Sequence, residues 1–123
     1  MVKLTKQEIR DRLRPAQLTI GSSRTNFFGE DVPERKIRYI VAIFIFGDAT
    51  SSRLVEIEKV KEDDTYEMVF DNIGVAPTEK VQLPIDGYDI EDPLITLEGG
   101  TNLSAIADAG APEATVIYWD NDI

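Results

Sequence analysis

The feature that most constrains this chain is one continuous apolar stretch in its first half. It lies within the sequence Lys36-Ile-Arg-Tyr-Ile-Val-Ala-Ile-Phe-Ile-Phe46, and after Arg38 its only polar side-chain group is a tyrosine hydroxyl. Branched and aromatic side chains pack well in an extended chain and lose rotamer freedom in a helix, so the stretch predicts a β-strand. Because its apolar residues do not alternate with polar ones, we expect a central strand with a core on each side, or with one side sealed by a partner. The apolar run is far shorter than the roughly 20 residues of a membrane-spanning helix.

Cysteine and histidine are both absent from the 123 residues. Without cysteine the chain has no disulfide, no thiolate nucleophile and no zinc–thiolate site. Without histidine it lacks the usual general base near neutral pH and the commonest metal ligand. The sequence therefore predicts no catalytic residues, no cofactor and no bound transition metal.

Clusters of acidic residues are the remaining candidates for chemistry. They lie in three places: Asp86, Asp89, Glu91 and Asp92; Glu62, Asp63 and Asp64; and Asp120 and Asp122. None has the spacing of an EF-hand loop, and glycoside hydrolysis by paired carboxylates also needs a cleft with sugar-stacking aromatic residues. We expect these acids to be solvated surface, and calcium binding by a loop remains an open alternative.

Charge is distributed very unevenly along the chain. The net charge is −10, yet residues 1–38 carry nine Lys and Arg against five acids, while residues 39–123 carry four against eighteen. A basic head on an acidic body is typical of an interaction arm. The acidic body is expected to repel nucleic acid, and no segment predicts membrane association.

The basic head contains one predicted helix. Thr5 and Glu8 have the spacing of a capping box, and Leu4 and Ile9 fall at the two positions of a hydrophobic staple. Ile9 and Leu13 share one face, and the proline at position 15 ends the run. A helix of about two turns is not stable alone in water, so it must dock on its own body or on a neighbour. The first residues contain no apolar stretch of the kind found in secretory signals.

Residues 16–34 show no sustained periodicity and predict an irregular, extended connector. The adjacent aromatic residues Phe27 and Phe28 suggest an anchor for a pocket, either in this chain or in a partner. We therefore divide the chain into an N-terminal arm, residues 1–34, and a body, residues 35–123. The arm supplies the predicted partner-binding residues: Leu4, Ile9, Arg10, Leu13, Arg14, Phe27 and Phe28.

The body predicts about seven strands and no helix longer than a turn or two. After the central stretch, short runs with alternating or small apolar residues are separated by turn residues, at Leu54–Val60, Tyr66–Asp71, Val81–Leu83, Leu94–Leu97, Asn102–Ala107 and Ala114–Trp119. Short connections favour antiparallel neighbours, and the loop from Pro84 to Pro93 is the expected place for a change of sheet. The fold class is therefore all-β, an antiparallel β-sandwich of jelly-roll or Greek-key type.

Part of the body resembles a known group of proteins. The carrying segments are Tyr39-Ile-Val-Ala-Ile-Phe-Ile-Phe-Gly-Asp-Ala-Thr-Ser-Ser-Arg-Leu-Val-Glu-Ile57, Val75-Ala-Pro-Thr-Glu-Lys-Val-Gln-Leu-Pro84, Pro93-Leu-Ile-Thr-Leu-Glu-Gly-Gly-Thr-Asn-Leu-Ser-Ala105 and Ala114-Thr-Val-Ile-Tyr-Trp119. They are similar to small β-sandwich capsid decoration proteins and related virion structural proteins of tailed bacterial and archaeal viruses. The similarity covers residues 39–119 and consists of turn and strand patterns.

The resemblance implies a non-enzymatic virion protein, made in the host cytoplasm, that self-associates and docks on a major capsid protein or another shell protein. It also implies a homo-oligomer, with a trimer as the expected number. A fold alone does not determine function, so two other hypotheses stay open. One is a ligand- or carbohydrate-binding β-sandwich module, and the other is a subunit of a larger enzyme or assembly.

Overall fold

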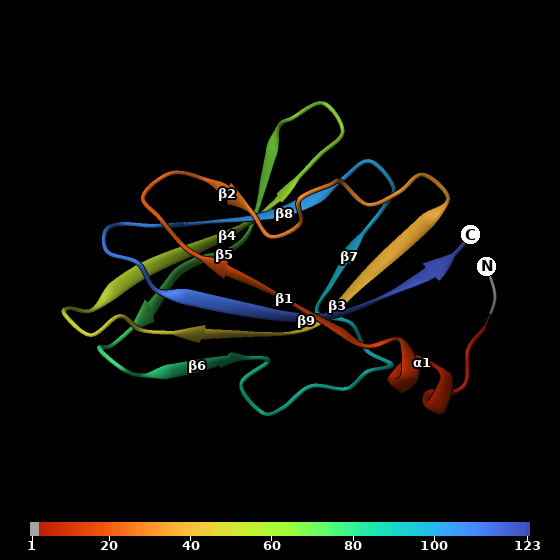
Figure 1. Cartoon of the computed structure of the whole chain (residues 1–123), viewed down its shortest axis with the longest axis horizontal. Coiled ribbons are helices and arrows are strands. Elements are labelled where there is room, and N and C mark those ends of the chain that lie inside the picture. The colour runs from red at the N-terminus through yellow and green to blue at the C-terminus, as the bar shows by residue number, and fades with distance from the viewer. Residues whose placement is uncertain (1–2) are drawn as a thin grey trace.

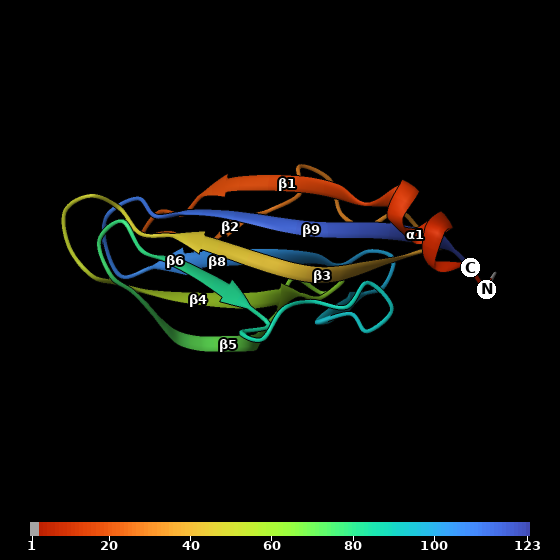
Figure 2. The ribbon, with the colours of Figure 1, turned by 90° about the horizontal axis from the view of Figure 1, so that it is seen from below.

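The chain folds as a two-layer antiparallel β-sandwich, in a computed structural model that describes residues 3–123. Figures 1 and 2 show the two layers and a short helix at the end where the termini lie. The all-β prediction is confirmed: the body contains the seven predicted strands, and two further strands lie in the segment before it. The elements are α1 (Lys6–Arg12), β1 (Arg14–Thr19), β2 (Thr25–Asn26), β3 (Lys36–Phe46), β4 (Arg53–Val60), β5 (Tyr66–Val75), β6 (Lys80–Leu83), β7 (Ile95–Leu97), β8 (Asn102–Ala107) and β9 (Glu113–Asp122).

The predicted central strand, β3, is the centre of the first sheet. This sheet has the order β1-β9-β3-β6, and β7 also pairs with β3; the second sheet has the order β2-β8-β4-β5. The chain crosses between sheets after both β3 and β8, so that β3 pairs with β9 in one layer and β4 pairs with β8 in the other. The connections after β3 and after β8 lie at the same end of the sandwich, opposite α1 (Figure 1).

A β-bulge explains how β3 is apolar on both faces. Its pairing with β9 shifts register between Ile40 and Ala42, so the side-chain alternation changes phase there. Ile40, Ile43 and Ile45 point into the main core between the sheets, while Val41 joins a second apolar cluster on the outer face of the first sheet. The prediction of a core on each side of this strand is therefore confirmed at Val41.

The segment predicted as an irregular connector contains two strands. Residues 14–19 pair with β9 along the edge of the first sheet, and residues 25–26 pair with β8 in the second. The alternating apolar residues Ala16, Leu18 and Ile20 pack against the main core, and this alternation explains why the segment is a strand. The boundary at residue 34 is corrected accordingly, because only residues 3–13 of the described chain lie outside the sandwich.

The loop from Pro84 to Pro93 does not carry the chain to the other sheet, which corrects a second expectation. The strands on either side of it, β6 and β7, both pair with β3. The eleven residues of β3 are long enough to pair with β6 through Ile43–Phe46 and with β7 through Arg38–Ile40. The loop therefore runs along one edge of the first sheet.

Helical structure is confined to α1 within residues 3–123, in agreement with the predicted absence of a longer helix in the body. Within the same residues, no helix has both the length and the apolar character needed to cross a membrane.

Candidate interaction surface

The outer face of the first sheet is covered at one end by α1. The helix begins with the predicted capping box: the Glu8 amide donates to the Thr5 hydroxyl at 3.2 Å, and the Thr5 amide donates to the Glu8 carboxylate at 3.1 Å. From this helix Ile9 packs with Val41, Ile90 and Trp119 into the second apolar cluster. We call this region the covered half.

The other end of the same face has no such cover, and we call it the open half. It consists of Phe44 and Phe46 on β3, Thr115 and Glu113 on β9, and Lys80 on β6. Their neighbours along each strand pack into the main core, so these five side chains lie on the outer face. Phe46 is 44% exposed although it continues the most apolar strand of the molecule. An aromatic side chain left this open on a sheet face is a candidate contact for another surface.

The strand register places the charged residues of the open half in one row with Phe46. Phe46 is directly opposite Glu113 of β9 on one side and Lys80 of β6 on the other. The next row holds Phe44 between Thr115 and Gln82. Adjacent strands are about 4.8 Å apart, so each row presents an aromatic centre flanked at short range by polar groups.

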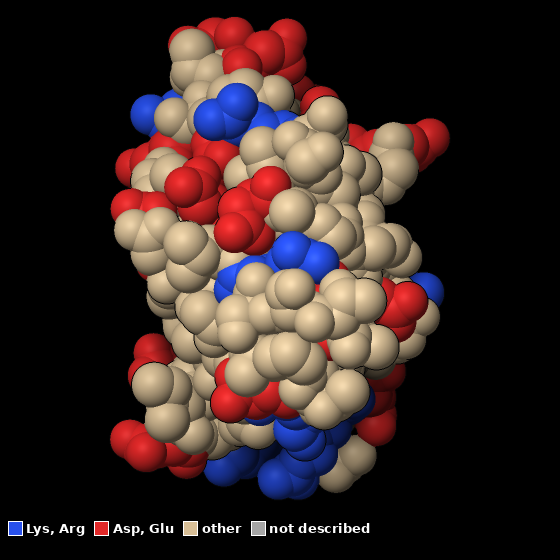
Figure 3. Space-filling model, turned by 90° about the vertical axis from the view of Figure 1, so that its left-hand side faces the viewer, with Lys and Arg blue, Asp and Glu red and all other residues tan. Residues whose placement is uncertain are grey.

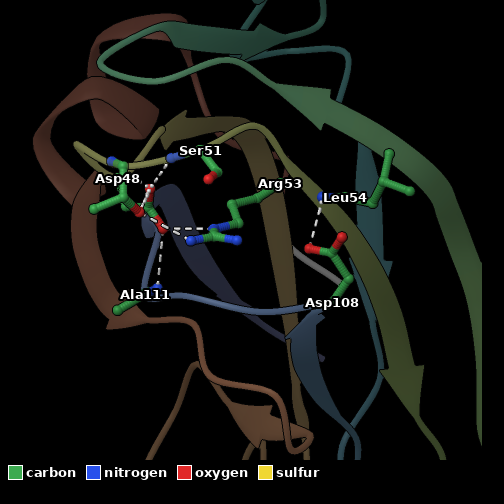
Figure 4. Close-up of polar contacts among 7 residues, drawn as sticks. Asp48, Ser51, Arg53, Leu54, Asp108 and Ala111 are labelled. Atoms are coloured by element: carbon green, nitrogen blue, oxygen red, sulfur yellow. Dashed lines mark hydrogen bonds and ion pairs between the residues drawn. The ribbon is translucent and has the colours of Figure 1, made fainter.

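A polar cluster fixes the loops beside the open half. Asp48 accepts hydrogen bonds from Arg53 Nε at 2.6 Å, from the amides of Thr50 and Ser51 at 3.0 and 3.2 Å, and from the Ala111 amide at 3.4 Å. These contacts join the loop after β3 to the loop before β9 (Figure 4). The donors, first of all Arg53, hold the pKa of Asp48 well below its usual range. The cluster therefore stabilises the loops that flank the Phe46–Glu113 pair.

A second polar contact supports the same junction. Asp108, in the loop after β8, accepts a hydrogen bond from the Leu54 amide at 3.0 Å (Figure 4). Gly110 in that loop has φ of +72°, and a β-carbon at this position would collide with the Asp48 carboxylate and with Arg53. A residue with a side chain is thus excluded from this turn by both its conformation and its neighbours.

The N-terminal segment at the covered half, residues 3–14, carries five cations against two acids, and Asp89, Glu91 and Asp120 of the body lie beside it. Lys3, Arg10 and Arg14 are exposed there, with no ion pair to any described residue. The other two cations of this segment have partners: Lys6 lies 3.6 Å from Glu91, and Arg12 donates to the Asp120 carbonyl at 3.4 Å. We call Lys3, Arg10, Arg14 and the adjoining Leu4 and Leu13 the basic end.

A hollow of about 550 Å³ adjoins the basic end. It lies between α1 and the loop from Pro84 to Pro93, and is lined by Lys6, Arg10, Leu13, Tyr88, Asp89 and Ile90. Two cations, one carboxylate (Asp89) and apolar groups thus line the same hollow, so a partner segment here would need acidic and apolar side chains placed toward Arg10 and Leu13.

Two of the predicted partner-binding residues lie in the main core of their own chain, which corrects that prediction. Phe27 and Phe28 are buried between the sheets. The Phe28 ring lies 4.3 Å from the guanidinium of Arg38 and 4.9 Å from the ring of Tyr118, and Arg38 pairs with Asp120 at 2.7 Å. This stack seals one end of the sandwich, so the aromatic pair is an anchor within the chain.

The predicted residues of the helical segment fall into two groups. Ile9 is buried against its own sheet, so α1 packs on its own body through this residue. Leu4 and Leu13 pack only partly against that cluster, and Arg10 and Arg14 are exposed. The predicted role in binding a partner therefore stays a prediction for four accessible residues: Leu4, Arg10, Leu13 and Arg14.

The acidic loops do not form a metal centre among residues 3–123, where no group of three or more acids is arranged to hold an ion. Several acids instead bind within their own turns: Asp63 accepts from Thr65, and Asp89 accepts from the Glu91 amide. Figure 3 shows the end of the sandwich opposite α1, where acidic side chains are spread over the face and do not gather in one cleft.

The residues of the open half were not among the predicted contacts. The sequence carries a signal for Phe44 and Phe46. A strand with apolar residues on both faces must either have its second face covered or leave it exposed. The sequence carries no signal for the row that joins Phe46 to Glu113 and Lys80, because this row depends on the pairing of three strands that are distant in sequence.

No protein-family model matches the sequence, and no curated protein matches it. Among solved structures, the chain is similar to a protein described under "Bacillus endospore appendages form a novel family of disulfide-linked pili", with 12% identity, a TM-score of 0.46 and coverage of 87% of this chain and 83% of that one. A pentameric capsid protein from metagenomic phage sequences gives 12% identity and a TM-score of 0.42, over 85% of this chain and 60% of that one. PirA gives 9% identity and a TM-score of 0.43, over 89% and 94% of the two chains. At this level of similarity, none of them identifies a function for this chain.

Proposed function

We propose that this protein is a non-enzymatic structural subunit of a virion, a capsid decoration protein that associates with copies of itself and docks on a shell protein. The observation that carries the docking is the basic end, where Lys3, Arg10 and Arg14 are exposed and form no ion pair with any of residues 3–123, on a chain of net charge −10. Unpaired cations beside Leu4 and Leu13 favour a protein surface that offers acidic and apolar groups together. The resemblance of residues 39–119 to decoration proteins supports the same role.

The side-chain inventory supports a structural role over an enzymatic one. The chain has no histidine and no cysteine. Its most strongly shifted carboxylate, Asp48, is bound by Arg53 and by backbone amides, which is the environment of a structural ion pair. A general acid or base near neutral pH would need the opposite shift, toward a raised pKa.

The arrangement of aromatic residues argues against the carbohydrate-binding alternative. Such a module needs a planar row of exposed rings for stacking on sugars. Here Tyr66 lies on β5 of the second sheet, away from Phe46 on β3, and Tyr88 meets Phe44 edge to face with ring planes at 86°, so the rings do not form a planar row. The exposed rings therefore offer no platform for stacking on a sugar.

Binding to empty shells tests the docking role. The shells are assembled from the major capsid protein encoded near the gene for this chain, and binding is followed by co-sedimentation. We expect the wild type to sediment with the shells, and the double variant Arg10→Glu/Arg14→Glu to lose at least roughly tenfold in affinity because two attractive contacts become repulsive. The variant Lys61→Glu, a charge reversal at an exposed turn, is the matched control and should bind like the wild type. Equal binding by all three proteins, or no binding by any, would refute the docking role.

A further inference from the structure

We propose that the open half is a two-fold interface between two copies of this chain, with Phe46 on the symmetry axis and Glu113 of each copy facing Lys80 of the other. The inference rests on the proposed self-association and names the surface that carries it. It starts from the row Glu113–Phe46–Lys80, in which an acid and a base lie on opposite sides of an exposed ring.

The charges of this row are complementary to themselves. Consider two copies whose open halves face each other, related by a two-fold axis that runs parallel to β3 and passes between the two Phe46 rings. The rotation exchanges the two sides of β3, so that Glu113 of one copy meets Lys80 of the other, twice in the interface. An axis perpendicular to the strands would instead place Glu113 against Glu113 and Lys80 against Lys80, which is repulsive. Charge complementarity therefore favours a second copy of this chain as the partner, and it also fixes how that copy is oriented.

The second row agrees with the same axis. Phe44 lies on β3 two residues before Phe46, so it also falls near the axis, between Thr115 and Gln82. The rotation brings Thr115 of one copy to Gln82 of the other, and a hydroxyl and an amide can form a hydrogen bond. The interface would thus have an aromatic centre with a polar border on each side, which is the usual anatomy of a protein–protein contact.

Space beside Phe46 is compatible with a second ring. A hollow of about 190 Å³ lies next to it on the side of β9 and β1, lined by Gln17, Leu18, Thr19, Phe46, Glu113, Ala114 and Thr115. The partner's aromatic side chain can fill part of this hollow. Burying exposed aromatic area supplies the favourable free energy, at about 25 cal/mol per Å², while the charge pairs set orientation.

The test is a charge exchange followed by sedimentation velocity at micromolar concentration. We expect the wild type to form dimers, and Glu113→Lys and Lys80→Glu each to weaken self-association by about tenfold or more, because both pairs become like-charged. Mixing the two variants should restore association to the wild-type level, since every contact in the mixed pair again joins opposite charges. Circular dichroism and thermal unfolding verify that both variants, which change exposed residues, remain folded.

A matched control separates this pairing from a general effect of net charge. Glu113→Lys makes the chain less acidic, and so lowers the overall repulsion between copies, yet we expect it to weaken association. Glu67→Lys makes the same change of charge at an exposed site of the second sheet, and association should stay equal or increase. Failure of the mixed variants to associate, a wild-type chain that remains monomeric, or a trimer unaffected by either reversal would overturn the two-fold interface. The shell-binding result at the basic end is independent of all three outcomes, and a trimer would still support self-association through a different surface.

Discussion

The covered and open halves of the first sheet are built from the same strands but differ in what lies over them. In the covered half, α1 places Ile9 over Val41 and Trp119, and these residues are at most 6% exposed. In the open half, Phe46 of the same strand is 44% exposed and belongs to neither apolar cluster. The bulge near Val41 separates the two halves. The apolar outer side of β3 is thus sealed only in part by its own chain.

The difference shows what each half contributes. The covered half buries apolar side chains within one molecule, so changes there should appear in the free energy of unfolding. The open half leaves Phe46 in water, so changes at Phe46 should have little effect on folding and a large effect on association. The following predictions test this division.

The largest effect on stability is expected in the covered half. Trp119→Ala removes a large buried side chain and leaves a cavity beneath α1, which should lower the free energy of unfolding by about 3–5 kcal/mol. Phe46→Ser, in the open half, should change it by less than about 0.5 kcal/mol. Urea unfolding followed by circular dichroism measures both values. Comparable losses in the free energy of unfolding for the two variants would show that both halves contribute to folding to the same extent.

The polar cluster beside the open half should make stability depend on acid pH. The pKa of Asp48 is lowered in the folded chain, mainly by Arg53, so its contribution is present above the unfolded value of about 3.9 and is lost as pH falls below it. Asp48→Asn lacks this carboxylate and should be less stable than the wild type at neutral pH. The difference in melting temperature between the two proteins should shrink as the pH falls below about 4. A constant difference across that range would contradict the assigned ion pair.

A smaller effect is expected at the start of α1. Thr5→Ala removes the hydroxyl that accepts from the Glu8 amide, and should lower the free energy of unfolding by about 1 kcal/mol. Because α1 seals the covered half, amide hydrogen exchange should increase first in α1, while the residues around Phe46 remain unchanged. Exchange that rises equally in both regions would indicate that the helix and the open half are coupled.

The sequence was most informative where local chemistry decides the structure. The central strand and the capping box formed by Thr5 and Glu8 were both predicted, because each depends on residues that are neighbours in the chain. The strand β1 was missed because a proline and several polar residues hid the alternation of Ala16 and Leu18. Its stability comes from pairing with β9, which lies about a hundred residues away in the sequence.

The candidate site was predictable only in part, for the same reason. The exposed cations Arg10 and Arg14 were predicted as contacts from charge and helix length. Phe27 and Phe28 were assigned to a partner, although the core of their own chain accommodates them, since composition does not reveal which pocket an aromatic side chain fills. The self-complementary row around Phe46 depends on the register of three strands, and only the folded structure brings its members together.

The most direct test of the open half as an interface uses the absence of cysteine from the chain. Phe46→Cys introduces a single thiol on the proposed two-fold axis, where it can meet only its equivalent in a second copy. Leu54→Cys is the control, because Leu54 is 46% exposed, close to the 44% of Phe46, but lies on the second sheet. With a short bis-maleimide cross-linker, which spans the roughly 10 Å between two sheets packed face to face, we predict a covalent dimer for Phe46→Cys at micromolar concentration and a monomer for Leu54→Cys. Equal cross-linking of the two variants, or none for Phe46→Cys, would contradict the account.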